Sequence, residues 1–276
     1  MRLGSDPDFS LMPELFAPPI RPHVRAFGRF VRLADSVTDS TLIGREEKLA
    51  RLLGLEAALT GGECTLWSAE SQRVAIGLRE SLQATGIPAD HVRHILQALR
   101  RDARGHVCVG WHDVLAYCRF AAAPIGRYML HLLGEDQARC GRPADALSCG
   151  LRILRQLRDC GDPTIPFNRL CIPRAFLDDA MITPAHLRAP SAKGQARAVL
   201  DRVLDGVERL LADAAPLPGL IHDRGLRIHA AVVVCRAHKL RALPRPGDPL
   251  RETGGAYAWQ RRSCRWLGTV RGLARC

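Results

Sequence analysis

The chain has 276 residues, of which 47% are hydrophobic and 25% charged, and its formal net charge is +12. This length and composition allow one large domain, or two modest ones, with a sizeable core. Charged residues interrupt the apolar runs every few positions, which excludes a transmembrane helix, and the first residues lack the apolar segment of a signal peptide. We therefore expect a cytoplasmic protein.

The positive charge comes almost entirely from arginine, because lysine occurs only at Lys48, Lys193 and Lys239. Arginine spread along the whole chain, with only 5% aromatic residues, does not fit a basic groove lined by stacking platforms. We expect no nucleic-acid partner. Attraction to an anionic substrate or to an anionic membrane surface fits the charge better.

The ten cysteines include no Cys-x-x-Cys pair and are spaced irregularly between Cys64 and Cys276. Without an export signal, this distribution favours free, buried cysteines over a disulfide framework. His91 and His94 have no cysteine partners at ligand spacing, so we expect them on a helix surface and predict no zinc site.

Apolar residues recur at helical spacing along most of the chain, and no segment alternates convincingly like a strand. In chain order, helices are predicted over about residues 22–39, 49–57, 71–84, 88–99, 111–133, 144–160, 193–214 and 217–243. Pro124 predicts a kink within the fifth of them. The pattern predicts an all-α domain over residues 1–250, with helices around a central cavity or core, and a poorly packed arginine-rich tail over residues 251–276.

The first predicted helix carries an acidic pair. Asp35 and Asp39 are four residues apart, so their carboxylates share one helix face, and Arg32 lies one turn earlier on the same side. Carboxylates beside an arginine can hold Mg²⁺ together with a substrate phosphate. At this spacing alone, a solvated helix face is the more common explanation.

Four segments in a fixed order give this pair its context. They are RPHVRAFGRFVRLADSVTD at 21–39, WHDVLAYCRFAAAPIGR at 111–127, GLRILRQLRDCGD at 150–162 and RLCIP at 169–173. Over roughly residues 10–250 the chain resembles the squalene/phytoene synthase family, and within it the bacterial hydroxysqualene synthase branch of hopanoid biosynthesis. The resemblance implies an isoprenoid-synthase-like helical bundle, in which two aspartate-rich segments hold Mg²⁺ ions at the mouth of a hydrophobic cavity and grip a diphosphate.

The resemblance also implies roles for individual residues. Asp35 and Asp39 would be the first metal-binding pair, and Asp159 would lead the second site, where Asp162 is a further acidic candidate. Pro163 disfavours helical geometry at residue 162, so Asp162 does not simply take the position four residues after Asp159.

Three further residues are implied at the substrate. Arg32 would contact the diphosphate, Arg127 is a weaker candidate for the same role, and Tyr117 would lie near the reacting carbons. Without the family context, Tyr117 would be interpreted as a half-buried tyrosine and Arg127 as part of a solvated helix face. The same context places the Pro124 kink beside the cavity.

The chain departs from the family pattern, most of all at the second site. Arg155 replaces the usual asparagine, Arg152 replaces a usual glutamine, and Pro163 replaces the trailing aspartate. Ser36 stands where an aspartate is usual, and Cys171 where a tyrosine is usual. Arg155 either substitutes for one ion and binds the diphosphate directly, or repels the metal and weakens catalysis.

The functional prediction is therefore an Mg²⁺-dependent enzyme that converts presqualene diphosphate to hydroxysqualene or squalene. Condensation of two prenyl diphosphates is an alternative within the family. A non-catalytic member that binds a lipid or protein partner is the alternative from another class. We expect no nicotinamide site, because no glycine-rich dinucleotide fingerprint occurs. The apolar product predicts peripheral association with a membrane.

Overall fold

The computed structural model describes residues 11–62, 67–158, 160, 166–188 and 194–242. Within these residues every regular element is helical, which confirms the predicted all-α class. The α-helices are α1 (Arg21–Asp39), α2 (Arg45–Leu59), α3 (Ala69–Thr85), α4 (Asp90–Ala103), α5 (Trp111–Ala121), α6 (Ala123–Leu132), α7 (Gln137–Arg158), α8 (Arg174–Asp179), α9 (Gln195–Ala214), α10 (Leu217–Leu220) and α11 (Arg224–Ala242). Short 3₁₀ turns lie at Pro13–Leu15, Phe167–Arg169 and Pro184–Arg188.

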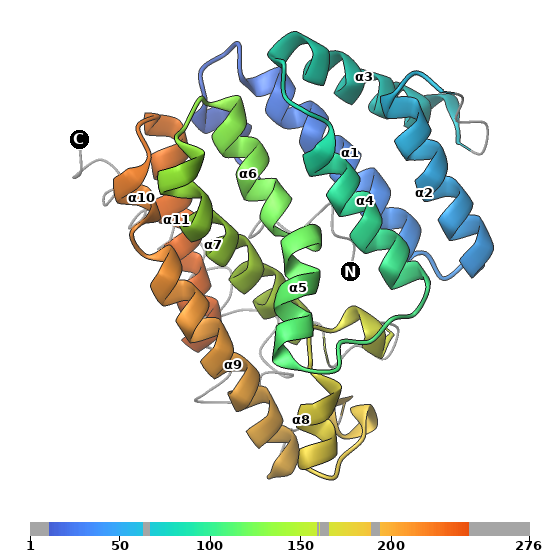
Figure 1. Ribbon diagram of the computed structural model, residues 1–276, viewed down its shortest axis with the longest axis vertical. Helices are drawn as coiled ribbons and strands as arrows, with labels where there is room; N and C mark the ends of the chain where they lie inside the picture. The colour runs from blue at the N-terminus through green and yellow to red at the C-terminus, as the bar shows by residue number, and fades with distance from the viewer. Residues whose placement is uncertain (1–10, 63–66, 159, 161–165, 189–193, 243–276) are drawn as a thin grey trace.

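The helices form two groups that face each other (Figure 1). In one group α1 packs against α3 and α4, and α2 packs against α3 and α4. In the other group α7 is central, with α6 on one side and α9 and α11 on the other. Helices α5 and α6 connect the groups, because both contact α4 as well as α7. The space that matters for function lies between α1 and α7.

Helix α1 begins where predicted, with Pro22 in its first turn, a position where the missing N–H of proline costs nothing. Its inner face contains Val24, Phe27 and Phe30, all fully buried. The same face continues into Asp35, which is only 4% exposed. A carboxylate at the end of an apolar stripe is costly unless another group compensates its charge, so this face is more than a packing surface.

Two predicted helices are each divided in two. The predicted kink at Pro124 is a break, because Ala122 adopts φ −130° and ψ −48° between α5 and α6. The single helix expected over 217–243 is also wrong. The carboxylate of Asp223 accepts a hydrogen bond of 2.7 Å from the Leu226 N–H and so starts α11 afresh. Buried Glu135 accepts bonds from the Asp223 and His222 N–H groups and holds this junction in place.

Helix α7 is longer than predicted. It starts at Gln137 rather than near residue 144, because the Asp136 carboxylate caps the N–H of Ala138 at 2.8 Å. Pro143 lies inside the helix, where the sequence pattern suggested a boundary. The extra turns let α7 run from α10 to the cavity.

The structure also bears on the predictions for the cysteines, the histidines and a membrane-spanning helix. All seven cysteines of the described residues are free and buried. His94 is exposed as expected, but His91 is half-buried and shares a 3.0 Å hydrogen bond with His131. In the described part of the chain, no helix is long and apolar enough to cross a membrane. The proposed boundary at residue 250 and the tail lie outside the described residues.

Candidate active site

A cavity opens between α1 and α7, and about 1040 Å³ of it, counting its mouth, is free of atoms. Its walls come from α1, α4, the α5–α6 break and α7. The lining residues are Leu11, Phe27, Gly28, Val31, Arg32, Asp35, Ile95, Ala98, Leu99, Ala121, Ala122, Ile125, Ser148, Leu151, Arg152 and Arg155. Most of these side chains are apolar, and the charged ones are three arginines and one aspartate.

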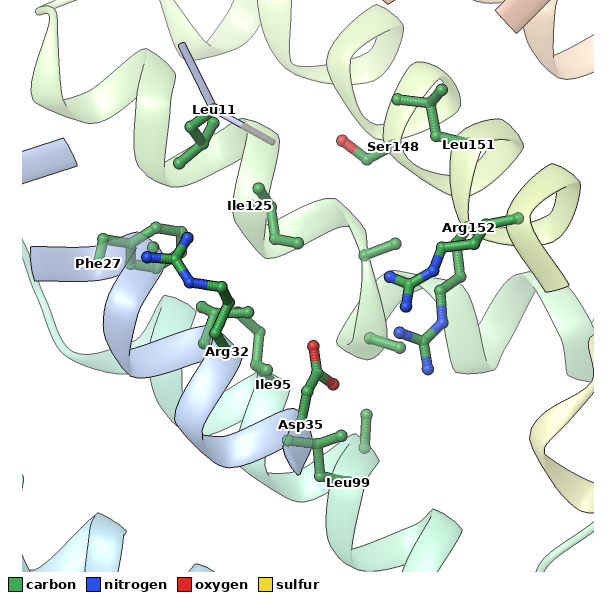
Figure 2. A pocket seen from close by; sticks show the side chains of 16 residues that line it. Leu11, Phe27, Arg32, Asp35, Ile95, Leu99, Ile125, Ser148, Leu151 and Arg152 are labelled. Atoms are coloured by element: carbon green, nitrogen blue, oxygen red, sulfur yellow. The ribbon is translucent and has the colours of Figure 1, made fainter. Parts of the chain in front are cut away.

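Asp35 faces this cavity from α1, opposite Arg152 on α7 (Figure 2). Within the described residues, no side chain forms a hydrogen bond to its carboxylate. Burial raises the pKa of the Asp35 carboxyl, and the nearby charges of Arg152 and Arg169 oppose that rise. An ionised Asp35 therefore depends on positive charge supplied across the cavity.

Arg32 also lines the cavity, but its guanidinium does not reach toward Asp35. It lies back along α1 near Phe27 (Figure 2), where a Cβ at Gly28 would lie 3.4 Å from one of its nitrogens. The Arg32 side chain is exposed, so it can change rotamer without unpacking the core. Arg32 thus forms part of the cavity wall and remains exposed to a ligand that enters the cavity.

Asp39 has a different environment from Asp35. It is more than a third exposed, and Arg169 donates a hydrogen bond of 2.7 Å to its carboxylate. The same guanidinium lies 3.6 Å from buried Asp102 on α4. The two carboxylates of the acidic pair therefore share a helix face as predicted, but of the two only Asp35 lines the cavity.

Tyr117 lies behind the cavity wall. Its hydroxyl donates a hydrogen bond of 2.8 Å to Asp102 and accepts one of 2.6 Å from Arg152. Burial raises the pKa of the Tyr117 hydroxyl well above its ordinary value, so the phenol stays protonated and can donate to Asp102. Tyr117 and Asp102 together orient the Arg152 guanidinium, and Tyr117 does not itself line the cavity.

Arg127 is placed away from these groups. Its guanidinium forms a bidentate pair with Asp145, at 2.7 and 2.8 Å, and joins α6 to α7. The backbone of α7 comes close to this guanidinium at Gly141, where any Cβ would collide with it. These contacts explain Arg127 as a structural residue, and its role toward a diphosphate stays a prediction.

Comparison with known proteins assigns the chain to a family. The family model for squalene/phytoene synthase matches residues 3–263. The chain belongs to the squalene/phytoene synthase family. It is 33% identical over 246 residues to a hydroxysqualene synthase from Sinorhizobium fredii. This match covers 89% of this chain and 82% of that protein. A hydroxysqualene synthase from Rhodopseudomonas palustris is 32% identical, over 90% of this chain and 82% of that protein.

Solved structures agree with this assignment. The crystal structure of squalene synthase HpnC from Alicyclobacillus acidocaldarius superposes with a TM-score of 0.70 at 25% identity and covers 86% of this chain and 87% of that one. A dehydrosqualene synthase gives a TM-score of 0.69 at 17% identity, over 94% of this chain and 89% of that one, which shows the shared fold. The general kind of reaction is thus that of the squalene/phytoene synthase enzymes.

The described residues of this family member fit Mg²⁺ on one side of the cavity only. Asp35 is a buried carboxylate that lines the cavity and accepts no hydrogen bond from a described side chain, so it offers the hard oxygen ligand that Mg²⁺ prefers. Asp39, one turn further along α1, is paired with Arg169 but keeps exposed surface outside the cavity lining. Arg152 and Arg155, which line the same cavity from α7, carry only donors and cannot ligate a metal.

Asp159 and Asp162, predicted for the second metal site of this family, lie outside the described residues, as does Pro163. No cluster of three or more metal-ligating side chains occurs in the part of the chain that is described. The position of the second site therefore stays a prediction.

A second, more apolar space continues from this cavity toward α10 and α11. The two spaces share Leu11, Ile125, Ser148 and Leu151 in their walls. In the second space the polar side chains are Ser148 and His229, and Nδ1 of His229 is buried without a partner among the described residues. Together the two spaces are charged at one end and hydrophobic at the other.

Sequence reasoning missed Asp102 and Arg169 as members of the site. Arg169 opens the fourth motif, RLCIP, and that position was the available signal. Asp102 had no local signal, because its partners Tyr117, Arg152 and Arg169 lie 15 to 67 residues away in the chain.

Proposed function

We propose that the protein converts presqualene diphosphate to hydroxysqualene with the help of Mg²⁺. The observation that carries this proposal is the polarity of the cavity: Asp35 faces Arg152 at one end, and an apolar space extends from there to α11. A prenyl diphosphate has the same division into an anionic head and a long hydrocarbon part. The names of the relatives support hydroxysqualene as the product.

In this reaction the carbon–oxygen bond to the diphosphate breaks, and the electron pair leaves with the diphosphate. The resulting carbocation rearranges, a water oxygen bonds to carbon, and that water loses a proton. Bound Mg²⁺ would stabilise the departing negative charge. Asp35 and Asp39 would hold the metal ion. Arg32 and Arg152 would orient the diphosphate from opposite walls. The apolar walls around Ile125 and Leu151 would keep water away from the carbocation.

The test is incubation of the purified protein with presqualene diphosphate and Mg²⁺, followed by mass spectrometry of the extracted lipid. Hydroxysqualene from the wild type, with an Asp35→Asn variant on the order of a hundred-fold slower, supports the proposal. Squalene formed only with a nicotinamide, or presqualene diphosphate formed from farnesyl diphosphate, would instead assign one of the other family reactions. No product of any kind beside an active control enzyme favours a non-catalytic member.

We also propose that the protein works at the surface of a membrane, because its product would be insoluble in water and the chain carries a net charge of +12. Sedimentation with vesicles containing an anionic lipid should show binding that weakens with salt. Absence of binding at low salt contradicts this part of the proposal.

A further inference from the structure

The charge of the cavity wall is unusual for a site that relies on metal ions alone. Among the described lining residues, three guanidinium groups, those of Arg32, Arg152 and Arg155, stand against the single carboxylate of Asp35. Asp102, which lies behind the wall 3.6 Å from Arg152, offsets part of this positive charge. Guanidinium groups that line a cavity attract an anion to it.

Arg152 and Arg155 occupy successive turns on one face of α7, so both side chains enter the cavity from the same wall. Arg152 is held in position, because the Tyr117 hydroxyl accepts its 2.6 Å hydrogen bond and Asp102 lies 3.6 Å away. Its side chain is 11% exposed, and its Nε is buried without a partner among the described residues. A guanidinium fixed in this way keeps further N–H groups for a ligand.

We propose that Arg152 and Arg155 bind the diphosphate group directly and replace one of the divalent ions. This inference rests on the proposed function and concerns how the same cavity binds its substrate. Two adjacent guanidinium groups match diphosphate oxygens with paired, charge-assisted hydrogen bonds, and the partly buried wall strengthens them. Any Mg²⁺ would then be needed at the Asp35 side alone, and the protein would retain diphosphate affinity when Mg²⁺ is removed.

Calorimetric titration with inorganic pyrophosphate tests this, once in excess EDTA and once in Mg²⁺. The wild type should bind in EDTA, and Mg²⁺ should change the dissociation constant by less than about tenfold. Arg155→Asn and Arg152→Gln should each weaken binding in EDTA by at least about tenfold, because each loses a charge-assisted pair. Arg155→Lys should fall between them and the wild type, since it keeps the charge and loses the bidentate geometry.

The matched control is Arg139→Gln. Arg139 is exposed on the same helix and does not line the cavity, so its loss removes an equal charge from the protein and should leave the affinity unchanged. Thermal unfolding of each variant shows whether it is folded. If Arg152→Gln does not fold, the binding of pyrophosphate by Arg155→Lys tests the inference instead.

Two outcomes would overturn the inference. Pyrophosphate binding by the wild type in Mg²⁺ but not in EDTA means that metal ions carry the diphosphate, and the proposed function stands. Binding in EDTA that survives both arginine changes places the anion elsewhere. If farnesyl thiodiphosphate binds neither in EDTA nor in Mg²⁺, that result counts against the proposed function as well. The mass spectrometry of the reaction product tests the proposed function separately.

Discussion

Arg169 donates a hydrogen bond of 2.7 Å to Asp39, a residue that lies 130 positions earlier in the chain. The short 3₁₀ turn at Phe167–Arg169 is thereby fastened to the end of α1. The same guanidinium lies 3.6 Å from Asp102, whose other neighbours are Tyr117 and Arg152. A continuous set of charged and hydrogen-bonded groups thus runs from the acidic pair to the wall of the cavity.

Replacing Arg169 should therefore weaken the whole fold. An Arg169→Gln variant leaves Asp102 with less compensating charge in a site that is 2% exposed, and the free energy of unfolding should fall by about 2–4 kcal/mol. Urea unfolding measures this. Arg174→Gln is the control, because its pair with Asp178 is more than half exposed and should contribute less than about 0.5 kcal/mol. Equal losses in the two variants would contradict a buried structural role for Arg169.

Tyr117→Phe should disturb the position of Arg152 in the cavity wall as well as the stability of the fold. The change removes the group that joins Asp102 to Arg152 and should lower stability by about 1–2 kcal/mol. Because Tyr117 positions Arg152, pyrophosphate affinity in EDTA should fall with it. Tyr128→Phe is the control, since the Tyr128 hydroxyl bonds the His23 carbonyl at 3.4 Å and Tyr128 does not line the cavity. If pyrophosphate affinity is unchanged in Tyr117→Phe, the positioning role is wrong.

Acid should destabilise the protein through His229. Burial, with a further contribution from the charge of Arg236, lowers the pKa of His229 to about 4. The unfolded chain takes up this proton near pH 6.5. Stability from the neutral ring is therefore complete above about pH 6.5 and is lost as the pH falls toward 4, by up to about 3 kcal/mol.

A variant separates this residue from the other histidines. His229→Leu should flatten the dependence of the urea midpoint on pH between pH 7 and pH 4.5. His112→Gln, at an exposed position on α5, is the control variant. An equal pH dependence in wild type and His229→Leu would show that His229 is not the group responsible.

The passage between the two spaces should determine whether a long hydrocarbon chain can bind. Leu151 lines both spaces, and a larger side chain there narrows the connection. Leu151→Trp should therefore reduce the affinity for farnesyl thiodiphosphate by at least about tenfold while pyrophosphate affinity stays the same. Leu53→Trp on α2, where the leucine is 55% exposed, should change neither. A similar loss for both ligands would indicate general damage to the site.

Local patterns in the sequence predicted much of the fold. Helical spacing of apolar residues such as Val24, Phe27 and Phe30 identifies α1 and its buried face. The predicted end of the third helix near residue 84 agrees with α3, which Gly86 terminates with φ +68°. Spacing also placed Asp35 and Asp39 on one helix face. These features depend on residues three or four apart, so the sequence contains the information directly.

The remaining features depend on contacts that no local pattern contains. The start of α11 at Arg224 depends on Glu135, nearly ninety residues earlier, which binds the N–H groups before the helix. The different environments of Asp35 and Asp39 depend on Arg169, and the position of Arg152 depends on Asp102. The structure places Tyr117 behind the wall that Arg152 forms, and its closeness to the reacting carbons, implied by the motif, stays a prediction.

The central claim is that the cavity between Asp35 and Arg152 replaces the diphosphate of presqualene diphosphate with a hydroxyl group taken from water. The most direct measurement is the reaction in ¹⁸O-labelled water with Mg²⁺, with mass analysis of the extracted lipid. The account predicts hydroxysqualene that carries a single heavy oxygen, at a rate that falls on the order of a hundred-fold in Asp35→Asn. Unlabelled product, or undiminished activity in Asp35→Asn, would contradict it.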